Sequence, residues 1–229
     1  MRFVSALMVF SIFLVLSGNL FAQEEEELIA KDLLEVSIFG GLAIPAGGLS
    51  DWTSTSSDLG TAALGTKTGF DLGVDVGLFL TPSLSLGFDF TYSQFGIQTD
   101  SVEASSMNHR IFSPTLYLKY FFFGESNLVP YLKGGAGVDV VKYATRVKET
   151  NTNNYAYREL SYDPAFAVTA GAGFFYYTHD YGGLFFEANF HNGFTKNTKG
   201  SFHDEKFEFG EQSTLIDIHA GIIVFFGSE

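Results

Sequence analysis

The chain contains no cysteine, few prolines and, after its first residues, no long apolar run. Without cysteine it cannot form disulfides, thiolate metal sites or a lipid anchor on a cysteine after a signal sequence. Only 5 of its 229 residues are proline, against 25 glycines. No apolar run beyond residue 22 is long enough for a transmembrane helix. Basic residues are also scarce, 13 against 26 acidic ones, and the formal charge of −13 disfavours binding to nucleic acid.

The first 22 residues predict a secretory signal peptide. Arg2 precedes the apolar stretch Phe3–Leu16, and Ala22 ends a segment that fits a small-residue cleavage site. The apolar stretch is too short for a membrane anchor. We therefore expect residues 1–22 to be a signal peptide and residues 23–32 an acidic lead-in. Residues 33–229 then form one domain by size.

Eight stretches of this domain alternate large apolar residues with small or polar ones. In Phe70–Leu80, six large apolar side chains share one face, whereas glycines, two aspartates and Phe79 share the other. Aromatic residues make up 17% of the chain, which favours strands over helices. The predicted strands are Leu33–Ile44, Thr68–Leu80, Leu84–Phe95, His109–Phe122, Val129–Tyr143, Ala165–Thr178, Leu184–Phe194 and Thr214–Phe226.

The connections between these strands alternate in length. Residues 81–83, 124–127 and 179–183 form short turns, whereas residues 45–67, 96–108, 144–164 and 195–213 form long polar connections. Short turns on one side and long loops on the other are typical of outer-membrane barrels. The pattern predicts an all-β fold, an eight-stranded antiparallel up-and-down transmembrane barrel with both termini on the periplasmic side. Pro114 lies within the fourth strand, where we expect a bulge or a missing ladder bond.

A soluble barrel of the lipocalin type is the structural alternative, since its strands also alternate. Its apolar face points inward, so roughly three dozen large apolar side chains would have to fit an interior with little spare room. The membrane barrel, with apolar residues facing lipid and polar ones facing the lumen, is favoured.

Three segments resemble the eight-stranded outer-membrane barrel family that includes OmpA- and OmpX-type domains and opacity-type surface proteins. They are Ser83–Gly96 (SLSLGFDFTYSQFG), Val129–Val138 (VPYLKGGAGV) and Ile216–Phe226 (IDIHAGIIVFF). The resemblance extends over the whole mature chain. It implies a porin-family barrel in the outer membrane of a diderm (Gram-negative-type) bacterium and is specific for the fold, not for a function.

The charged residues of the barrel fall on inward positions. The short turns fix the hairpin register and place Asp75 opposite Asp89 and Lys119 opposite Lys133. Each like-charged pair is unfavourable alone, so we predict that they combine with Glu187 in one salt-bridge cluster that plugs the lumen. Inward aromatic rings are predicted to fill the remaining space, namely those of Tyr117, Phe121, Tyr131, Phe175 and Tyr177. Room for these rings is expected at the inward glycines Gly73, Gly77, Gly87, Gly135, Gly137, Gly171 and Gly173. Other predicted lumen polar residues are Glu35, Asp71, Asp139, His191, Asp217 and His219.

The cluster has two interpretations, structural charge pairing and a gate or cation path. Pairing is favoured because it is the ordinary way to accommodate buried charges. We expect neither a metal site nor a cofactor, since no two histidines have the spacing of a metal site. Trp52, Tyr155 and Tyr157, in long connections, are candidates for contact with a partner.

These observations predict a non-enzymatic, monomeric outer-membrane protein with an envelope-structural or adhesive role through its long loops. Its expected partners are membrane lipid or lipopolysaccharide and an extracellular protein or glycan, and not nucleic acid. A narrow porin for ions or small solutes is one alternative. The other is a lipid A-modifying enzyme, as some small outer-membrane barrels are, but His191 has no neighbouring serine and faces inward.

Overall fold

The computed structural model describes the chain from Leu34 to Gly227 with short gaps. The described residues are 34–50, 53–56, 60–63, 66–96, 108–123, 126–148, 155–179, 181–195, 199–202, 205–208 and 212–227. The predicted signal peptide, the acidic lead-in and Trp52 lie outside these residues. No helix in the described part is long and apolar enough to cross a membrane.

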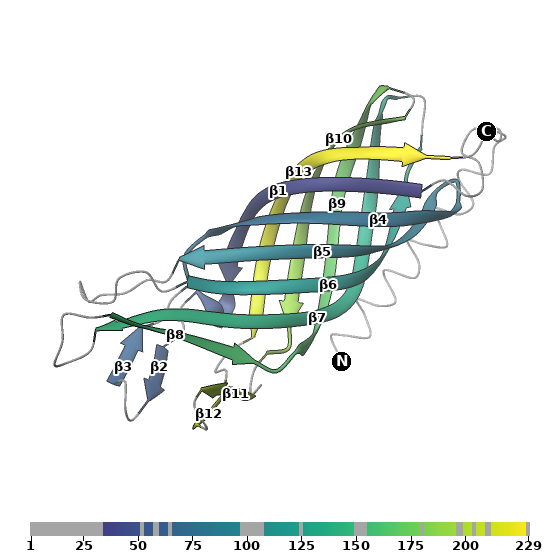
Figure 1. Cartoon of the computed structure of the whole chain (residues 1–229). Coiled ribbons are helices and arrows are strands. Elements are labelled where there is room, and N and C mark those ends of the chain that lie inside the picture. Colours follow the sequence, from purple (N-terminus) through teal and green to yellow (C-terminus); the bar gives the residue numbers. More distant parts are fainter. Residues whose placement is uncertain are drawn as a thin grey trace. The chain divides into compact units, whose positions relative to one another are not determined.

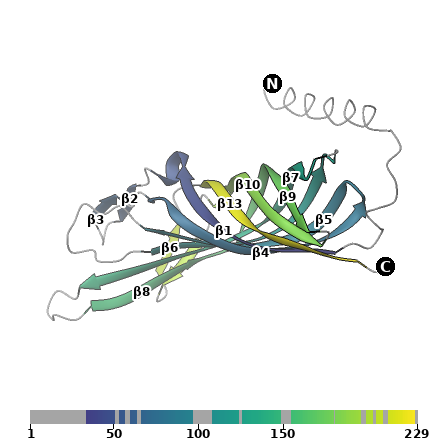
Figure 2. The same ribbon diagram turned by 90° about the horizontal axis from the view of Figure 1, so that it is seen from above.

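Eight long antiparallel strands form a closed barrel (Figures 1 and 2). Each pairs with the barrel strand before and after it, and the first closes on the last. Their bounds are β1 (Leu34–Ala46), β4 (Gly69–Thr81), β5 (Leu84–Gly96), β6 (Asn108–Phe121), β7 (Leu128–Lys148), β9 (Ala165–His179), β10 (Gly182–Gly193) and β13 (Ser213–Phe226). The predicted strand order and topology are confirmed.

The predicted hairpin registers are also confirmed. Asp75 pairs with Asp89 between β4 and β5, and Lys119 pairs with Lys133 between β6 and β7. Pro114 pairs with β5, but the β6–β7 pairing is interrupted between Phe112 and Thr115 without a change of register. This is the expected missing ladder contact, because proline has no N–H to donate.

The outer face of the barrel is apolar and the inner face polar. Phe88, for example, is 55% exposed on the outside, whereas its neighbour Asp89 is buried within. Other exposed apolar residues of the barrel are Ile38, Leu42, Leu72, Val74, Leu116, Leu118, Leu132, Phe166, Leu184, Phe190, Ile216 and Ile222. An apolar surface of this extent is unfavourable in water and satisfied by lipid, so the soluble alternative is wrong.

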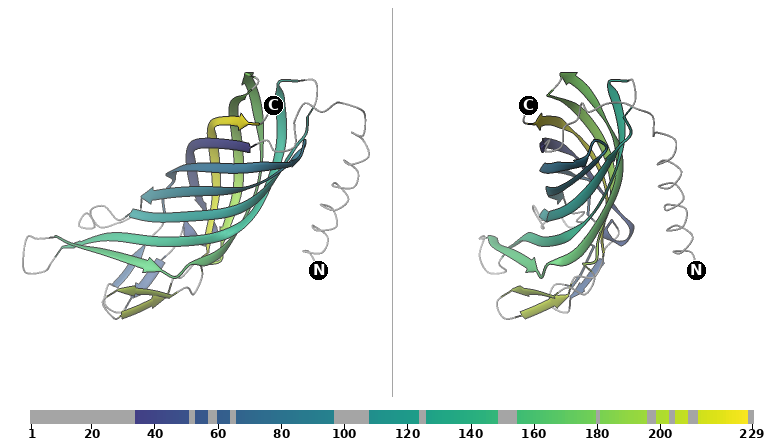
Figure 3. Two further views of the ribbon diagram at one scale, coloured as in Figure 1. Left: turned by 45° about the vertical axis from the view of Figure 1, so that its right-hand side comes forward. Right: turned by 90° about the vertical axis from the view of Figure 1, so that its right-hand side faces the viewer.

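The predicted connection 144–164 contains more strand than the sequence indicates. The strand β7 has 21 residues and runs on to Lys148, where its far end pairs with β8 (Tyr155–Tyr162). The short β11 (Lys199–Phe202) and β12 (Glu205–Glu208) continue the same sheet beyond β8. Figure 3 shows this hairpin running past the other barrel strands at the long-loop end. Threonine, tyrosine and valine favour extended backbone in this segment. The sequence prediction missed these strands because it considered only strands long enough to cross the membrane.

The first long connection also contains regular structure. A single 3₁₀ turn, η1 (Gly47–Leu49), follows β1, and Gly47 has a positive φ of 61°. The strands β2 (Thr53–Ser56) and β3 (Gly60–Ala63) form a separate two-stranded sheet.

Candidate functional site

Two buried lysines and four buried carboxylates meet in the barrel lumen. The Lys119 Nζ lies 3.2 Å from Glu35 Oε1 and 3.6 Å from Asp75 Oδ2. The Lys133 Nζ lies 2.6 Å from Asp89 Oδ2, 3.2 Å from Glu187 Oε1 and 3.9 Å from Asp75 Oδ2. We call these six residues the charge cluster: Glu35, Asp75, Asp89, Lys119, Lys133 and Glu187. Asp75 joins the two lysines, so the cluster is continuous across the lumen.

Tyr117 stands at the centre of the charge cluster. Its hydroxyl donates to Glu35 Oε1 at 2.8 Å and lies 3.3 Å from Asp75 Oδ1. Its ring lies 5.0 Å from the Lys119 Nζ and 4.8 Å from the Lys133 Nζ, within the range of cation–π attraction. Side chains at Gly77 or Gly87 would overlap this tyrosine, so those glycines make room for it, as predicted.

The other inward glycines make room for different groups. Gly173 accommodates the Tyr131 ring and Gly73 accommodates Phe39. Gly135 and Gly137 instead lie against Thr115 and backbone, and Gly171 against Asn189, so the expectation that all of them face rings is wrong. Because glycine has no side chain, these positions leave room inside the barrel for the polar side chains of Thr115 and Asn189.

An aromatic layer fills the lumen on the short-turn side of the charge cluster. The Phe79 ring stacks on Phe121 with centroids 5.4 Å apart, and its other side meets Phe225 at 5.9 Å. Phe225 contacts Phe175, and Phe121 contacts Tyr131, each at 5.4 Å. The prediction included Phe121, Tyr131, Phe175 and Tyr177 as fillers, and the structure adds Phe79 and Phe225. Rings from several strands thus pack against one another across this end of the barrel.

Two histidine–carboxylate pairs lie on the long-loop side of the charge cluster. The His219 Nε2 lies 2.9 Å from Asp71 Oδ2, and its Nδ1 lies 3.7 Å from Glu187 Oε1. The His191 Nε2 lies 3.0 Å from Asp139 Oδ1. His219 therefore links Asp71 to the charge cluster through Glu187. The two histidines lie at different depths, since His219 pairs with Glu187 and His191 with Leu215.

A small polar cavity lies between these pairs and the charge cluster. It has a volume of about 20 Å³, room for one water-sized group. Its lining residues are Asp89, Thr91, Ser93, Ser113, Thr115, Thr169, Asn189, His191, Leu215, Asp217 and His219. The cavity is thus lined mainly by oxygen-bearing side chains.

The geometry at His191 differs from a Ser-His-Asp arrangement. The Ser113 hydroxyl donates to Asp139 Oδ1 at 2.6 Å, and the same carboxylate contacts His191. The carboxylate, not the imidazole, therefore contacts the serine. Ser213, the serine that follows in sequence, bonds instead to Thr195, with 3.1 Å between the hydroxyls. Neither serine is activated by a histidine base here.

The sequence found most lumen residues but not all of their partners. Glu35 was predicted only as inward, yet it is the main partner of Lys119. Asp71 and His219 meet because each pairs in register with Gly41, which has no side chain to separate them. The glycine at position 41 was a sequence signal for this contact. It could not be used, because the long connection after β1 does not determine the register of β1 with β4.

The candidates for partner contact and for metal binding remain. The contact candidates Tyr155 and Tyr157 lie on β8, where they pair with Lys148 and Arg146 of β7. Among the described residues, no group of three or more His, Asp or Glu could hold a metal ion.

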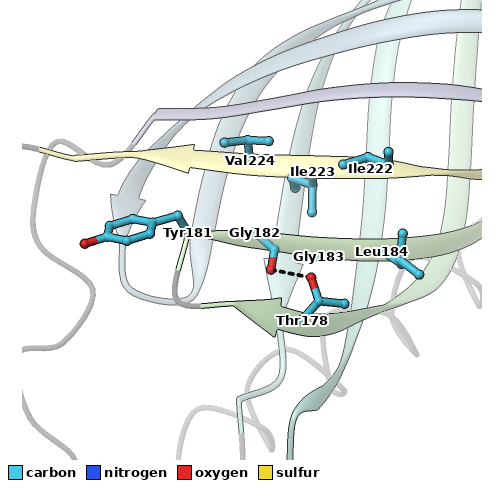
Figure 4. A pocket seen from close by; sticks show the side chains of 8 residues that line it. All are labelled: Thr178, Tyr181, Gly182, Gly183, Leu184, Ile222, Ile223 and Val224. Atoms are coloured by element: carbon cyan, nitrogen blue, oxygen red, sulfur yellow. Dashed lines mark hydrogen bonds between the residues drawn. The ribbon is translucent and has the colours of Figure 1, made fainter.

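A shallow apolar groove marks the outside of the barrel near the turn before β10 (Figure 4). It is lined by Thr178, Tyr181, Gly182, Gly183, Leu184, Ile222, Ile223 and Val224. Within it, Thr178 donates to the Gly182 carbonyl at 3.4 Å. The groove lies on the lipid side and does not connect with the lumen residues described above.

Comparison with known proteins agrees with the fold. No family model and no curated protein sequence matches the chain. The solved structure of OprG from Pseudomonas aeruginosa is 15% identical over 87% of this chain and 97% of its own, with a TM-score of 0.53. A major outer membrane protein from Thermus thermophilus is 10% identical over 84% and 99%, also with a TM-score of 0.53. Neisserial surface protein A is 15% identical over 86% and 98%, with a TM-score of 0.44.

At these identities the likeness shows the fold alone. The likeness agrees with two features that were established without it: the barrel is closed and eight-stranded, and its outer face is apolar around a charged interior. The chain therefore has the closed eight-stranded fold of outer-membrane β-barrels.

Proposed function

We propose that this protein is a non-enzymatic component of the outer-membrane surface that does not pass solutes through its lumen. Its role is to support the envelope or to contact partners outside the cell through its extracellular segments. The observation that carries the proposal is the filled lumen. Ion pairs span its middle, aromatic rings occupy its short-turn end, and the polar cavity on the long-loop side of the charge cluster holds about 20 Å³.

The extended sheet at the long-loop end supports contact outside the cell. The barrel strand β7 continues beyond the membrane-length part of its neighbours, and β8, β11 and β12 add to it. Such a surface is held by backbone hydrogen bonds and offers a firm platform for an extracellular protein or glycan. Membrane lipid or lipopolysaccharide surrounds the apolar belt, and a monomer suffices because the barrel has no open sheet edge in the membrane.

The first test is single-channel conductance of the refolded mature chain in a planar bilayer. The wild type is expected to be silent. The double variant Lys119→Ala/Lys133→Ala removes both lumen lysines and is expected to conduct, with Lys67→Ala as a control because Lys67 is exposed outside the lumen. Steady wild-type conductance would overturn the proposal in favour of a narrow porin.

A second test addresses the surface role. Residues 145–160, which include the paired ends of β7 and β8, would be replaced by a short turn. Cells carrying either protein would then be compared for binding to arrays of extracellular-matrix proteins and glycans. Loss of binding with unchanged barrel assembly supports the proposal. A changed lipid A mass spectrum in cells producing the wild type but not His191→Ala would instead indicate an enzyme.

A further inference from the structure

The lumen holds more negative than positive groups. Its described inward carboxylates are Glu35, Asp71, Asp75, Asp89, Asp139, Glu187 and Asp217, all buried. The cationic groups that face them are Lys119, Lys133, His191 and His219. Even if both histidines carry a proton, three negative charges are not balanced. An uncompensated buried charge is unfavourable, so this interior favours binding of a further cation.

Asp217 carries one of these unbalanced charges. Six of the seven carboxylates take part in an ion pair with a lysine or histidine, but no such pair joins Asp217 within the described part of the chain. The side chain is 5% exposed and lines the polar cavity. Its Oδ1 is buried without a hydrogen-bond partner, as is Oδ1 of Asn189, directly opposite on β10. Both residues line the same small cavity.

The cavity has the chemistry of a site for a hard cation. Carboxylate, amide and hydroxyl oxygens from Asp89, Thr91, Asn189 and Asp217 line it, and oxygen is the preferred ligand of such ions. The cationic side chains nearest to the cavity already form ion pairs with carboxylates. Lys133 binds Asp89 from the charge cluster, His191 binds Asp139, and His219 binds Asp71.

We propose that this cavity binds one monovalent alkali cation between Asp217, Asn189 and Asp89. A single charge fits because the two lining carboxylates, Asp89 and Asp217, include only one without an ion pair among the described residues, and because the volume holds one ion. The ion lowers the excess negative charge of the lumen by one and ties β13 and β10 to β5. It is held and not transported, since the aromatic layer fills the short-turn end.

The experiment is thermal unfolding of the refolded mature protein, followed by the β signal in circular dichroism. Wild type, Asp217→Asn and Asp163→Asn would be melted in sodium, potassium, calcium and choline chloride at matched ionic strength. Asp163 is exposed outside the barrel and gives the same charge change as a control. Sodium or potassium is expected to raise the wild-type and control midpoints above those in choline, increasingly with the logarithm of cation concentration, but not the midpoint of Asp217→Asn.

The outcomes are distinct. Equal midpoints in all four salts would overturn the proposal and leave water or a protonated carboxyl in the cavity. The same sodium response in Asp217→Asn would overturn it too, and stabilisation by calcium alone would contradict a monovalent site. If Asp217→Asn does not fold, crystals of the wild type soaked in a thallium(I) salt decide the question. Anomalous density beside Asp217 supports the site, and its absence refutes it.

Discussion

Replacing Lys133 by methionine should destabilise the barrel more than any other single change in the lumen. The Lys133 Nζ contacts Asp89, Glu187 and Asp75, and the side chain is 1% exposed. Methionine keeps much of the apolar stem but removes the charge. Asp75 then keeps Lys119 and Glu187 keeps His219 at 3.7 Å, whereas Asp89 has no cationic partner left among the described residues.

The magnitude follows from burial. Removing one partner of a buried ion pair costs about 3–5 kcal/mol, because the remaining charge cannot return to water. With an m value of about 2–3 kcal/mol/M, a loss of about 4 kcal/mol lowers the urea midpoint by about 1.5 M. Asp89 is also partly satisfied by the Thr91 hydroxyl at 2.6 Å and Glu187 by the Asn189 amide at 2.6 Å, so the lower half of the range is the more realistic expectation.

The assay is equilibrium urea unfolding of the refolded mature chain in lipid vesicles. Lys67→Met is the matched control, because Lys67 is exposed and its removal should leave the midpoint unchanged. The triple variant Lys133→Met/Asp89→Asn/Glu187→Gln should recover much of the loss, since it removes the stranded charges. If Lys133→Met unfolds at the same urea concentration as the wild type, the charges are not buried against one another and the reasoning is refuted.

Two further predictions concern the inner and outer faces of the wall. Gly87→Ala should lower the free energy of unfolding by about 1–3 kcal/mol, because the added Cβ would overlap Tyr117. Gly134→Ala is the control and should be neutral, since its Cβ would meet open space. Equal urea midpoints for the two variants would contradict the packing around Tyr117. Val74→Lys places a charge near the middle of the lipid-facing side of β4 and should cost about 2–4 kcal/mol in vesicles. Lysine at exposed Asp163 should change nothing, and a silent Val74→Lys would mean that this face is not in lipid.

Much of the lumen could be predicted because a barrel wall is regular. Period-two alternation assigns each residue to a face, and a short turn fixes the register of its hairpin. This is why the pairs Asp75–Asp89 and Lys119–Lys133 follow from counting back from two turns. It is also why Pro114 could be identified as the point where the ladder is interrupted.

Contacts across long connections could not be predicted in the same way. The meeting of Asp71 with His219 depends on the registers of β1 with β4 and β13, and no short turn sets either. The contact of Glu35 with Lys119 spans the lumen between strands that are not paired, so its distance depends on the curvature and shear of the closed wall. The hairpin extension of β7 likewise depends on pairing outside the membrane, where the alternation that marks the barrel strands is no longer required.

By itself, then, the sequence determined the class of fold, its orientation to lipid, the number of strands and the identity of the inward charges. These depend on local alternation and turn length, which the chain carries residue by residue. Only the tertiary structure decided which charge meets which, that Asp217 alone among the lumen carboxylates forms no ion pair in the described part of the chain, and that a cavity the size of one ion lies beside it. Those features depend on closing the sheet, because side chains from unpaired strands come within contact distance only when the barrel is complete.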